Sequence, residues 1–232
     1  MNPAVLSASV GALFAPGACA AELRAPGDPA LLLPEEAAFL GRAVPKRVRE
    51  FTAGRLCARR ALAEFGISDF PLRVAADRQA VWPHSMVGSI THTAGFCAAA
   101  VAERSRISAL GLDTEVVGHV NPEIWQRICA PGEMAWIESL PAATQAAAVT
   151  LIFSAKEAFY KCQFPLTGEP LGFHDARVEA VPQGPSEGML LVHACRSIVM
   201  AGHTALPVRG RYRYHEGFLT AGVSVAAGEP TQ

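Results

Sequence analysis

The order of helical and strand-like segments is the feature that most constrains what this chain can fold into. Residues 46–65 have the pattern of a helix that ends before a glycine, and residues 144–163 predict a second long helix. Other runs are rich in small and β-branched residues, which is typical of strands. These runs lie at 86–102, 107–117 and 211–226. The chain therefore predicts an α+β fold in which a helix and strands occur twice.

A short internal repeat supports two similar halves. Residues 95–99 (GFCAA) close the first set of segments much as residues 217–221 (GFLTA) close the second. Each of these stretches lies several tens of residues after a long predicted helix. Two similar α+β halves of about equal length would explain the repeat.

The charge balance excludes a surface that binds polyanions in general. The 232 residues include 20 basic and 21 acidic side chains, which gives a formal net charge of −1 at pH 7. No broad positive field would therefore attract nucleic acid. Half of the residues are apolar and 18% are charged, which suits a sizeable core and excludes a disordered chain. An anionic ligand must be held by a local cluster of charges.

The cysteines and the N-terminal residues predict a reduced, cytoplasmic protein. The six cysteines stand singly, with no C-x-x-C pair and no cysteine–histidine cluster, so a zinc site is not expected. Residues 1–21 carry no charged side chain, but a signal peptide begins with a basic segment and the first basic residue here is Arg24. Prolines and glycines interrupt this stretch, which is too short to span a membrane. We expect a strand or loop there and no membrane partner.

Two acidic residues follow an apolar run in the predicted strand 107–117. Side chains at i and i+2 share one face of a strand, so Asp113 and Glu115 project together while Leu112 points into a core. Neighbouring carboxylates repel each other unless a cation or solvent intervenes. Mg²⁺ typically takes one or two carboxylates together with phosphate oxygens of a substrate. The pair therefore predicts either a magnesium site or a solvated strand end.

The second predicted helix carries a polar stripe opposite its apolar face. Ser154, Glu157 and Lys161 share this stripe, and Phe153 and Tyr160 flank it. Glu157 and Lys161 could be an ordinary surface pair four residues apart, which stabilises a helix by only ~0.2–0.5 kcal/mol. Aromatic residues on the polar side favour a cleft instead.

The first predicted helix is rich in basic residues, and two of them border its apolar stripe. Arg47 and Arg55 lie close to Phe51 around the helix axis. Buried arginine needs an anionic partner. Phosphate suits the planar guanidinium, although an internal carboxylate would also serve. Further along, His92 could contact phosphate or lie neutral in a core.

Four stretches of the chain have the form of known motifs. G-x-D-x-E occupies residues 111–115, and F-S-x-K-E-A-x-x-K occupies residues 153–161. With residues 46–59 and 82–92, these motifs resemble, in the same order, those of the 4′-phosphopantetheinyl transferases. The similarity is to the class of enterobactin-synthetase component D and the surfactin-type enzymes. It extends over about residues 34–225, nearly the whole chain.

The resemblance implies a fold and a reaction. It implies a pseudo-twofold arrangement of two similar α/β halves, residues 1–105 and residues 106–232, with the active site at their interface. It implies transfer of 4′-phosphopantetheine from coenzyme A to a serine hydroxyl of an apo acyl-carrier or peptidyl-carrier protein, which releases 3′,5′-ADP. The carrier would belong to siderophore, polyketide, nonribosomal-peptide or fatty-acid synthesis. We expect a cytoplasmic monomer that binds neither nucleic acid nor membrane.

The resemblance also assigns catalytic and metal-binding roles to matching positions of the C-terminal half. Asp113, Glu115 and Glu157 would bind Mg²⁺, with the carbonyl of Thr114 also in reach. Glu157 would serve as third metal ligand or as general base. The expected catalytic residues are Asp113, Glu157 and Lys161. All three would also contact coenzyme A or its bound cation.

Further positions are implied to bind coenzyme A. Lys156 and Lys161 would steady the pyrophosphate and the pantetheine arm. The residues that would hold the 3′-phosphate and adenine end are Arg47, Arg55, Arg78 and His92, with Thr91 beside them among the residues that bind coenzyme A.

Two other functions remain open. One is a different Mg²⁺-dependent phosphoryl or nucleotidyl transferase that uses the same acidic cluster. The other is a catalytically silent module that binds coenzyme A or a carrier protein. A mere binding module does not need three carboxylates in such an arrangement, which favours an enzyme.

Overall fold

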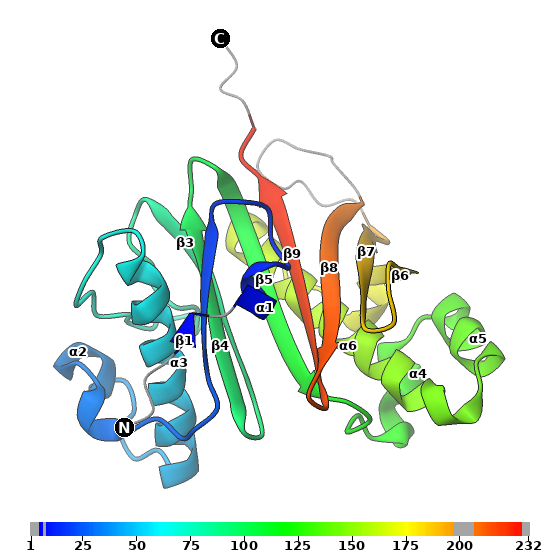
Figure 1. Cartoon of the computed structure of the whole chain (residues 1–232), viewed down its shortest axis with the longest axis horizontal. Helices are drawn as coiled ribbons and strands as arrows, with labels where there is room; N and C mark the ends of the chain where they lie inside the picture. The colour runs from blue at the N-terminus through cyan, green and yellow to red at the C-terminus, as the bar shows by residue number, and fades with distance from the viewer. Residues whose placement is uncertain (1–4, 7, 197–206, 229–232) are drawn as a thin grey trace.

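A four-stranded antiparallel sheet forms the N-terminal part of the protein (Figure 1). The computed structural model describes residues 5–6, 8–196 and 207–228. In the order of the sheet, the strands are β1 (Val5–Leu6), β2 (Ala18–Leu23), β4 (Phe96–Glu103) and β3 (Met86–Thr93).

Strand β4 is buried on both faces because a different hydrophobic cluster covers each of them. Cys97, Ala99 and Val101 pack in one cluster with residues of the long helix α3 (Pro45–Ala63). The alternating alanines of β4 pack on the opposite face with Phe14, which follows the short helix α1 (Ala8–Gly11). Side chains of successive strand residues point to opposite faces, so one apolar strand serves both clusters.

A five-stranded antiparallel sheet forms the C-terminal part, and helix α6 (Ala142–Thr167) lies behind it in Figure 1. Ile152, Ala155 and Phe159 of α6 share a core cluster with residues of the inner strands. In the order of the sheet, the strands are β5 (Ile107–Val116), β9 (Phe218–Ala226), β8 (Val208–His215), β7 (Glu187–Ala194) and β6 (Ala176–Pro182).

Gly111 allows β5 and α6 to touch. A Cβ atom at this position would stand 1.8 Å from the carbonyl oxygen of Ala158 on α6, and no side chain can be accommodated at that distance. The glycine of the G-x-D-x-E motif is therefore a requirement of packing. It brings the strand that carries Asp113 against the helix that carries Glu157.

The two halves repeat one topology, which confirms the expected pseudo-twofold α+β fold. The elements β2, α3, β3 and β4 give the strand order β2-β4-β3, and β5, α6, β8 and β9 give the same order, β5-β9-β8. In the C-terminal half, β6 and β7 come between α6 and β8 in the chain and extend the sheet beyond β8. The turns β3–β4 and β8–β9 contain Gly95 and Gly217, with φ of 78° and 81°. The rings of Phe96 and Phe218, which follow these glycines, lie 5.2 Å apart between centroids. The GF repeat of the sequence thus marks equivalent turns that meet.

The boundaries differ from the sequence prediction in several places. The expected strand 86–102 is two strands, because a turn at Ala94 and Gly95 folds it into the β3–β4 hairpin. The expected strand 211–226 is likewise the β8–β9 hairpin. Helix α6 continues beyond residue 163 to Thr167, with Pro165 in its last turn, and is capped by Gly168 in the left-handed conformation. The remaining short helices are η1 (Pro29–Leu31), α2 (Pro34–Ala37), η2 (Pro122–Ile124), α4 (Trp125–Ile128), α5 (Pro131–Ser139) and η3 (Phe173–Asp175).

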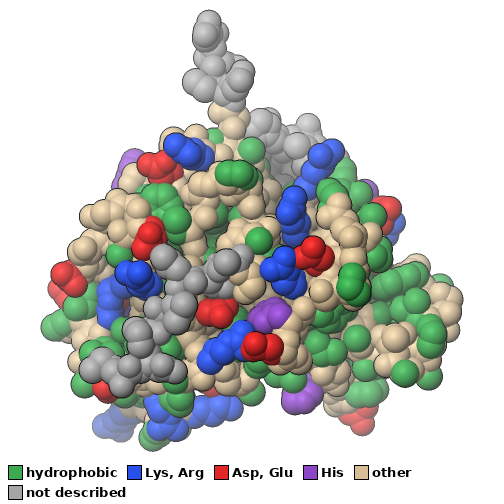
Figure 2. Space-filling model, in the orientation of Figure 1, with side chains coloured by type: hydrophobic (Ala, Val, Ile, Leu, Met, Phe, Trp, Pro, Cys, Tyr) green, Lys and Arg blue, Asp and Glu red, His purple; other side chains and the backbone are tan. Residues whose placement is uncertain are grey.

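The surface bears charges of both signs. Figure 2 shows basic and acidic side chains interspersed over the face that it draws. Within the described ranges, no helix combines the length and the apolar character that crossing a membrane requires. All six cysteines are free thiols.

Candidate active site

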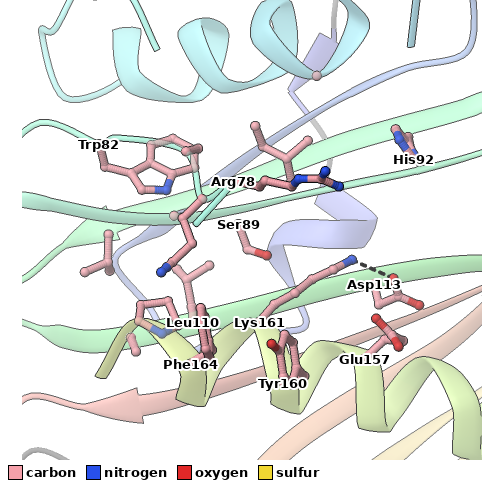
Figure 3. A pocket seen from close by; sticks show the side chains of 18 of the residues that line it. Arg78, Trp82, Ser89, His92, Leu110, Asp113, Glu157, Tyr160, Lys161 and Phe164 are labelled. Atoms are coloured by element: carbon pink, nitrogen blue, oxygen red, sulfur yellow. Dashed lines mark hydrogen bonds and ion pairs between the residues drawn. The ribbon is translucent and has the colours of Figure 1, made fainter. Parts of the chain in front are cut away.

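A cavity of about 620 Å³ lies where the two halves meet. Helix α3 and strand β3 line it from the N-terminal half, and β5 and α6 line it from the C-terminal half. Figure 3 shows Asp113, Glu157 and His92 toward one end of this cavity and Trp82 and Phe164 toward the other.

The acidic end of the cavity is organised by an ion pair. The Lys161 ammonium on α6 donates a hydrogen bond to Oδ1 of Asp113 over 2.7 Å and another to the carbonyl oxygen of Leu112 over 3.2 Å (Figure 3). The side chain of Asp113 is only 6% exposed. Its other oxygen, Oδ2, is buried with no hydrogen-bond partner in the part of the chain that the structure describes. A buried carboxylate oxygen of this kind is costly unless a ligand satisfies it.

The other two predicted acids, Glu115 and Glu157, line the same cavity. Burial, and then the negative charge of Asp113, raise the pKa of Glu115 to about 7, although Lys161 opposes this rise. Burial and Asp113 also raise the pKa of Glu157, again against the influence of Lys161. The three carboxylates thus repel one another in a poorly solvated space, and a cation placed among them would relieve that repulsion.

The strand that bears Asp113 is held in place by hydroxyl groups. Ser89 and Thr91 of β3 accept hydrogen bonds from the backbone N–H groups of Leu112 and Thr114, over 3.0 and 2.8 Å. On the other side, Ser154 of α6 donates to the carbonyl oxygen of Asp113 over 3.1 Å. Side chains from both halves therefore fix the backbone on either side of this carboxylate.

The donor set suits a hard cation that is completed by ligand atoms. Among the described residues, no three acidic, histidine or cysteine side chains stand close enough to form a ready-made metal cage. Mg²⁺ does not need such a cage, because it is usually bound by one or two carboxylates and keeps water and phosphate oxygens. The unpartnered Oδ2 of Asp113 and the neighbouring carboxylates fit this mode. Thr114 is fully buried and does not line the cavity, and its hydroxyl is paired with that of Thr220 at 2.9 Å. Its side chain projects from the face of β5 opposite to Asp113 and Glu115, so its carbonyl is the group that the motif would offer.

Four of the predicted nucleotide-binding residues line the cavity: Arg47, Arg55, Arg78 and His92. A ring nitrogen of His92 lies 3.1 Å from a guanidinium nitrogen of Arg47. Arg55 is 7% exposed, with its guanidinium 3.8 Å above the ring of Phe51. Burial lowers the pKa of Arg55 to about 10, so the group stays charged at neutral pH. The cavity therefore offers cations to an anionic ligand.

Lys156 was expected at the pyrophosphate, but the structure places it elsewhere. The side chain is buried within the C-terminal half, and its ammonium donates to Glu133 and to two backbone carbonyls over 2.7 to 2.9 Å. An ammonium has three N–H donors, so none remains for a ligand. Its neighbour in the motif, Glu157, faces the cavity because one residue along a helix turns the side chain by about 100°.

Two further expectations need correction. Thr91 does not line the cavity. It is buried, and its hydroxyl donates to Oδ1 of Asp113 over 3.5 Å. Phe153 does not border the polar stripe as a cleft wall, since its ring packs on Phe173 at 5.5 Å between centroids. Tyr160 does line the cavity and stacks on Phe164 at 5.3 Å.

The apolar side chains of the cavity, which include Trp82, Leu110, Phe164 and Leu166, were not predicted from the sequence. Trp82 stands in one of the recognised motifs, which was the available signal. Leu110 and Phe164 looked like ordinary core residues of a strand and a helix, and only the meeting of β5 with the end of α6 shows their position.

Comparison with known families defines the class of protein. Residues 35–102 match the family described as the 4′-phosphopantetheinyl transferase N-terminal domain, and residues 109–200 match the 4′-phosphopantetheinyl transferase superfamily. Together the two matches cover more than half of the chain. The chain therefore belongs to the 4′-phosphopantetheinyl transferase superfamily, in agreement with the motifs.

Two 4′-phosphopantetheinyl transferases are similar to this protein over most of the chain. The 4′-phosphopantetheinyl transferase Svp of Streptomyces mobaraensis is 38% identical over 206 residues, which are 88% of this chain and 82% of that protein. The 4′-phosphopantetheinyl transferase PptT of Mycobacterium tuberculosis is 34% identical over 82% of this chain and 85% of that protein. Enterobactin synthase component D of Escherichia coli K12 is 38% identical over 50% of this chain and 54% of that protein. A solved holo-[acyl-carrier-protein] synthase of Thermotoga maritima aligns over 53% of this chain and 65% of that chain, with a TM-score of 0.37 and 19% identity.

Proposed function

We propose that the protein transfers 4′-phosphopantetheine from coenzyme A to a serine hydroxyl of an apo acyl-carrier or peptidyl-carrier protein and releases 3′,5′-ADP. The observation that carries this proposal is the ion pair of Lys161 with Asp113, beside the unpartnered Oδ2 and the carboxylates of Glu115 and Glu157. Phosphoryl transfer depends mainly on positioning and on charge stabilisation, and this cavity supplies groups for both.

Mg²⁺ would be held by Asp113, Glu115 and Glu157, with the Thr114 carbonyl as a further oxygen. When bound, it would neutralise charge on the pyrophosphate oxygens of coenzyme A. Two N–H groups of Lys161 are engaged by Leu112 and Asp113, and the third would donate to a pyrophosphate oxygen.

Arg47, Arg55, Arg78 and His92 would bind the 3′-phosphate and adenine end of coenzyme A. Their support is the cationic lining on the α3 side of the cavity. Guanidinium groups bind phosphate through paired N–H donors. The apolar end, around Trp82 and Phe164, suits uncharged parts of the same ligand.

Glu157 would take the proton of the carrier serine or hold the cation, and each role needs its carboxylate. Its position on α6 faces the cavity, and its raised pKa brings the group closer to the range in which a general base works well. The leaving 3′,5′-ADP would depart with its phosphate charge balanced by Lys161.

The two halves of the chain would have different roles in this reaction. We propose residues 1–105 as the half that binds the 3′-phosphate and adenine end, and residues 106–232 as the half that bears the metal and catalytic groups. We further propose a cytoplasmic monomer that acts on a carrier protein of siderophore, polyketide, nonribosomal-peptide or fatty-acid synthesis.

Product analysis tests the proposal. The protein is incubated with coenzyme A and Mg²⁺, with and without an apo carrier protein, and 3′,5′-ADP is measured by chromatography. We expect 3′,5′-ADP only when the carrier is present, in an amount equal to the carrier modified. Release of phosphate from coenzyme A or simple nucleotides without a carrier would instead indicate another phosphoryl transferase.

A further inference from the structure

A buried carboxylate in the N-terminal half stands outside the cavity. Glu36, the third residue of α2, is fully buried. Its Oε2 accepts hydrogen bonds from a guanidinium nitrogen of Arg59 on α3 and from the backbone N–H of Leu33. Its Oε1 accepts the backbone N–H of Leu72 over 3.1 Å. A buried charge with this many partners fixes the segments that supply them.

Leu72 connects this carboxylate to the cavity. Its N–H is held by Glu36, and its carbonyl oxygen accepts a hydrogen bond from Nε of Arg55 over 3.1 Å. The same guanidinium lies over the ring of Phe51 and lines the cavity. Because Nε is occupied by Leu72, the guanidinium plane is fixed and its terminal nitrogens remain to meet a ligand.

The segment after Leu72 also reaches the cavity. Val74 and Ala80 form an antiparallel bridge, and the N–H of Val81 donates to the carbonyl oxygen of Arg73 over 2.9 Å. This small hairpin carries Arg78, which lines the cavity. By holding Leu72, Glu36 fixes the start of the segment that carries this hairpin. It also fixes the Leu72 carbonyl that accepts the hydrogen bond of Arg55.

The C-terminal half contains a matching arrangement. Glu133 is the third residue of α5, and like Glu36 it follows a proline that starts its helix. In both halves the acid pairs with a cation 23 residues later, Arg59 or Lys156, and that cation also donates to a carbonyl 28 residues before it. Glu133 likewise accepts the backbone N–H of a strand residue, Val178, over 2.7 Å. The same offset of 97 residues relates the acids and the cations.

The two arrangements differ in their relation to the cavity. The offset that relates Glu36 to Glu133 relates Arg55 to Ile152, an apolar residue buried in the core. The C-terminal acid therefore supports its half without a link to an arginine in the cavity. Substitution of Glu133 is therefore a control that distinguishes a loss of structural support from an effect on ligand binding.

We propose that Glu36 is a positioning residue for the nucleotide end of the cavity, acting through Leu72 on Arg55. This inference rests on the proposed function, in which Arg55 meets the 3′-phosphate of coenzyme A. Loss of the Glu36 charge would free the Leu72 backbone and loosen the guanidinium, so recognition of that phosphate would weaken. Ligands that lack the 3′-phosphate would bind as before.

Calorimetry with coenzyme A and with dephospho-coenzyme A, which lacks the 3′-phosphate, measures this effect. In Glu36→Gln we expect the preference for coenzyme A over dephospho-coenzyme A to fall roughly tenfold, as for the loss of one charge-assisted hydrogen bond. In Glu133→Gln the preference should equal that of the unmodified protein. In an Arg55→Ala background, Glu36→Gln should cause no further change, since coupled residues are not additive.

The binding measurements distinguish failure of the inference about Glu36 from failure of the proposed function. An unmodified protein that does not bind coenzyme A contradicts the proposed function itself. Binding of coenzyme A with no preference over dephospho-coenzyme A, or an unchanged preference in folded Glu36→Gln, overturns the inference and leaves the proposed function standing. An equal loss for both ligands would indicate mere structural support and also overturns it. If Glu36→Gln does not fold, Glu36→Gln/Arg59→Gln, which leaves no unpaired charge, carries the same expectation.

Discussion

Lys161 of α6 and Asp113 of β5 form an ion pair in which Nζ lies 2.7 Å from Oδ1, while Oδ2 of the same carboxylate is buried and unpartnered among the described residues. The Lys161 ammonium thus satisfies one oxygen of the buried carboxylate, and the other oxygen is available to a ligand. Gly111 makes this geometry possible, because it lets the strand approach the helix.

The first prediction concerns Lys161→Met. The substitution leaves the buried Asp113 carboxylate without its cation, which should lower the free energy of unfolding by about 3 kcal/mol. It also removes the proposed pyrophosphate donor, and so the transfer rate should fall roughly 100-fold. Urea unfolding and single-turnover transfer measure the two effects. Lys46→Met, at a side chain 83% exposed on α3, is the matched control, and equal effects of the two substitutions would rule out the special role of the pair.

The second prediction concerns Glu157→Gln. The amide keeps the shape of the side chain but can neither accept the serine proton nor supply a carboxylate to a cation. We expect transfer to fall at least about 100-fold, with an unchanged circular dichroism spectrum. Glu138→Gln, at an exposed position of α5, should retain full activity. Substantial turnover by Glu157→Gln would remove Glu157 from the reaction.

The third prediction follows from the pKa of Glu115, which burial and Asp113 raise from 4.5 to about 7. Between these pH values the folded state binds more protons than the unfolded state, so the free energy of unfolding should decrease as the pH rises through this window. Glu115→Gln should lose that part of the pH dependence. Urea unfolding at pH 5 to 8 without divalent cations compares the two proteins. Identical pH profiles would show that Glu115 is not held in its neutral form.

The fourth prediction concerns the contact between the two halves. Phe96 is 2% exposed and packs on Phe218 and on the ring of His215, with centroids 5.2 and 5.6 Å apart. Phe96→Ala should lower the free energy of unfolding by about 3 kcal/mol. Val181→Ala, at a residue 43% exposed on the edge strand β6, should change it by less than about 1 kcal/mol. A similarly small effect at Phe96 would mean that this contact does not hold the halves together.

Local sequence patterns predicted the elements that carry the site. The periodicity of α6 placed Glu157 and Lys161 on one face, and strand alternation placed Asp113 with Glu115; all four line the cavity. These predictions succeeded because they depend on helix and strand geometry alone.

Other features depend on contacts between distant segments, which local patterns do not contain. Lys156 is next to Glu157 in the motif, yet its role depends on Glu133, 23 residues earlier. Glu36 likewise looks like an ordinary surface acid of a short helix until Arg59 and Leu72 enclose it. The proline two residues before both Glu36 and Glu133 was the available signal, and the spacing of the two acids and their cations would have revealed the repeat.

Intact-mass measurement of an apo carrier protein tests the central claim most directly. The protein is incubated with coenzyme A, Mg²⁺ and each of several apo acyl-carrier and peptidyl-carrier proteins, with a carrier whose acceptor serine is replaced by alanine as control. We predict that at least one carrier gains the mass of a single phosphopantetheinyl group at that serine, and that the alanine control gains none. If the folded protein binds coenzyme A and every carrier keeps its original mass, the proposed transfer is contradicted.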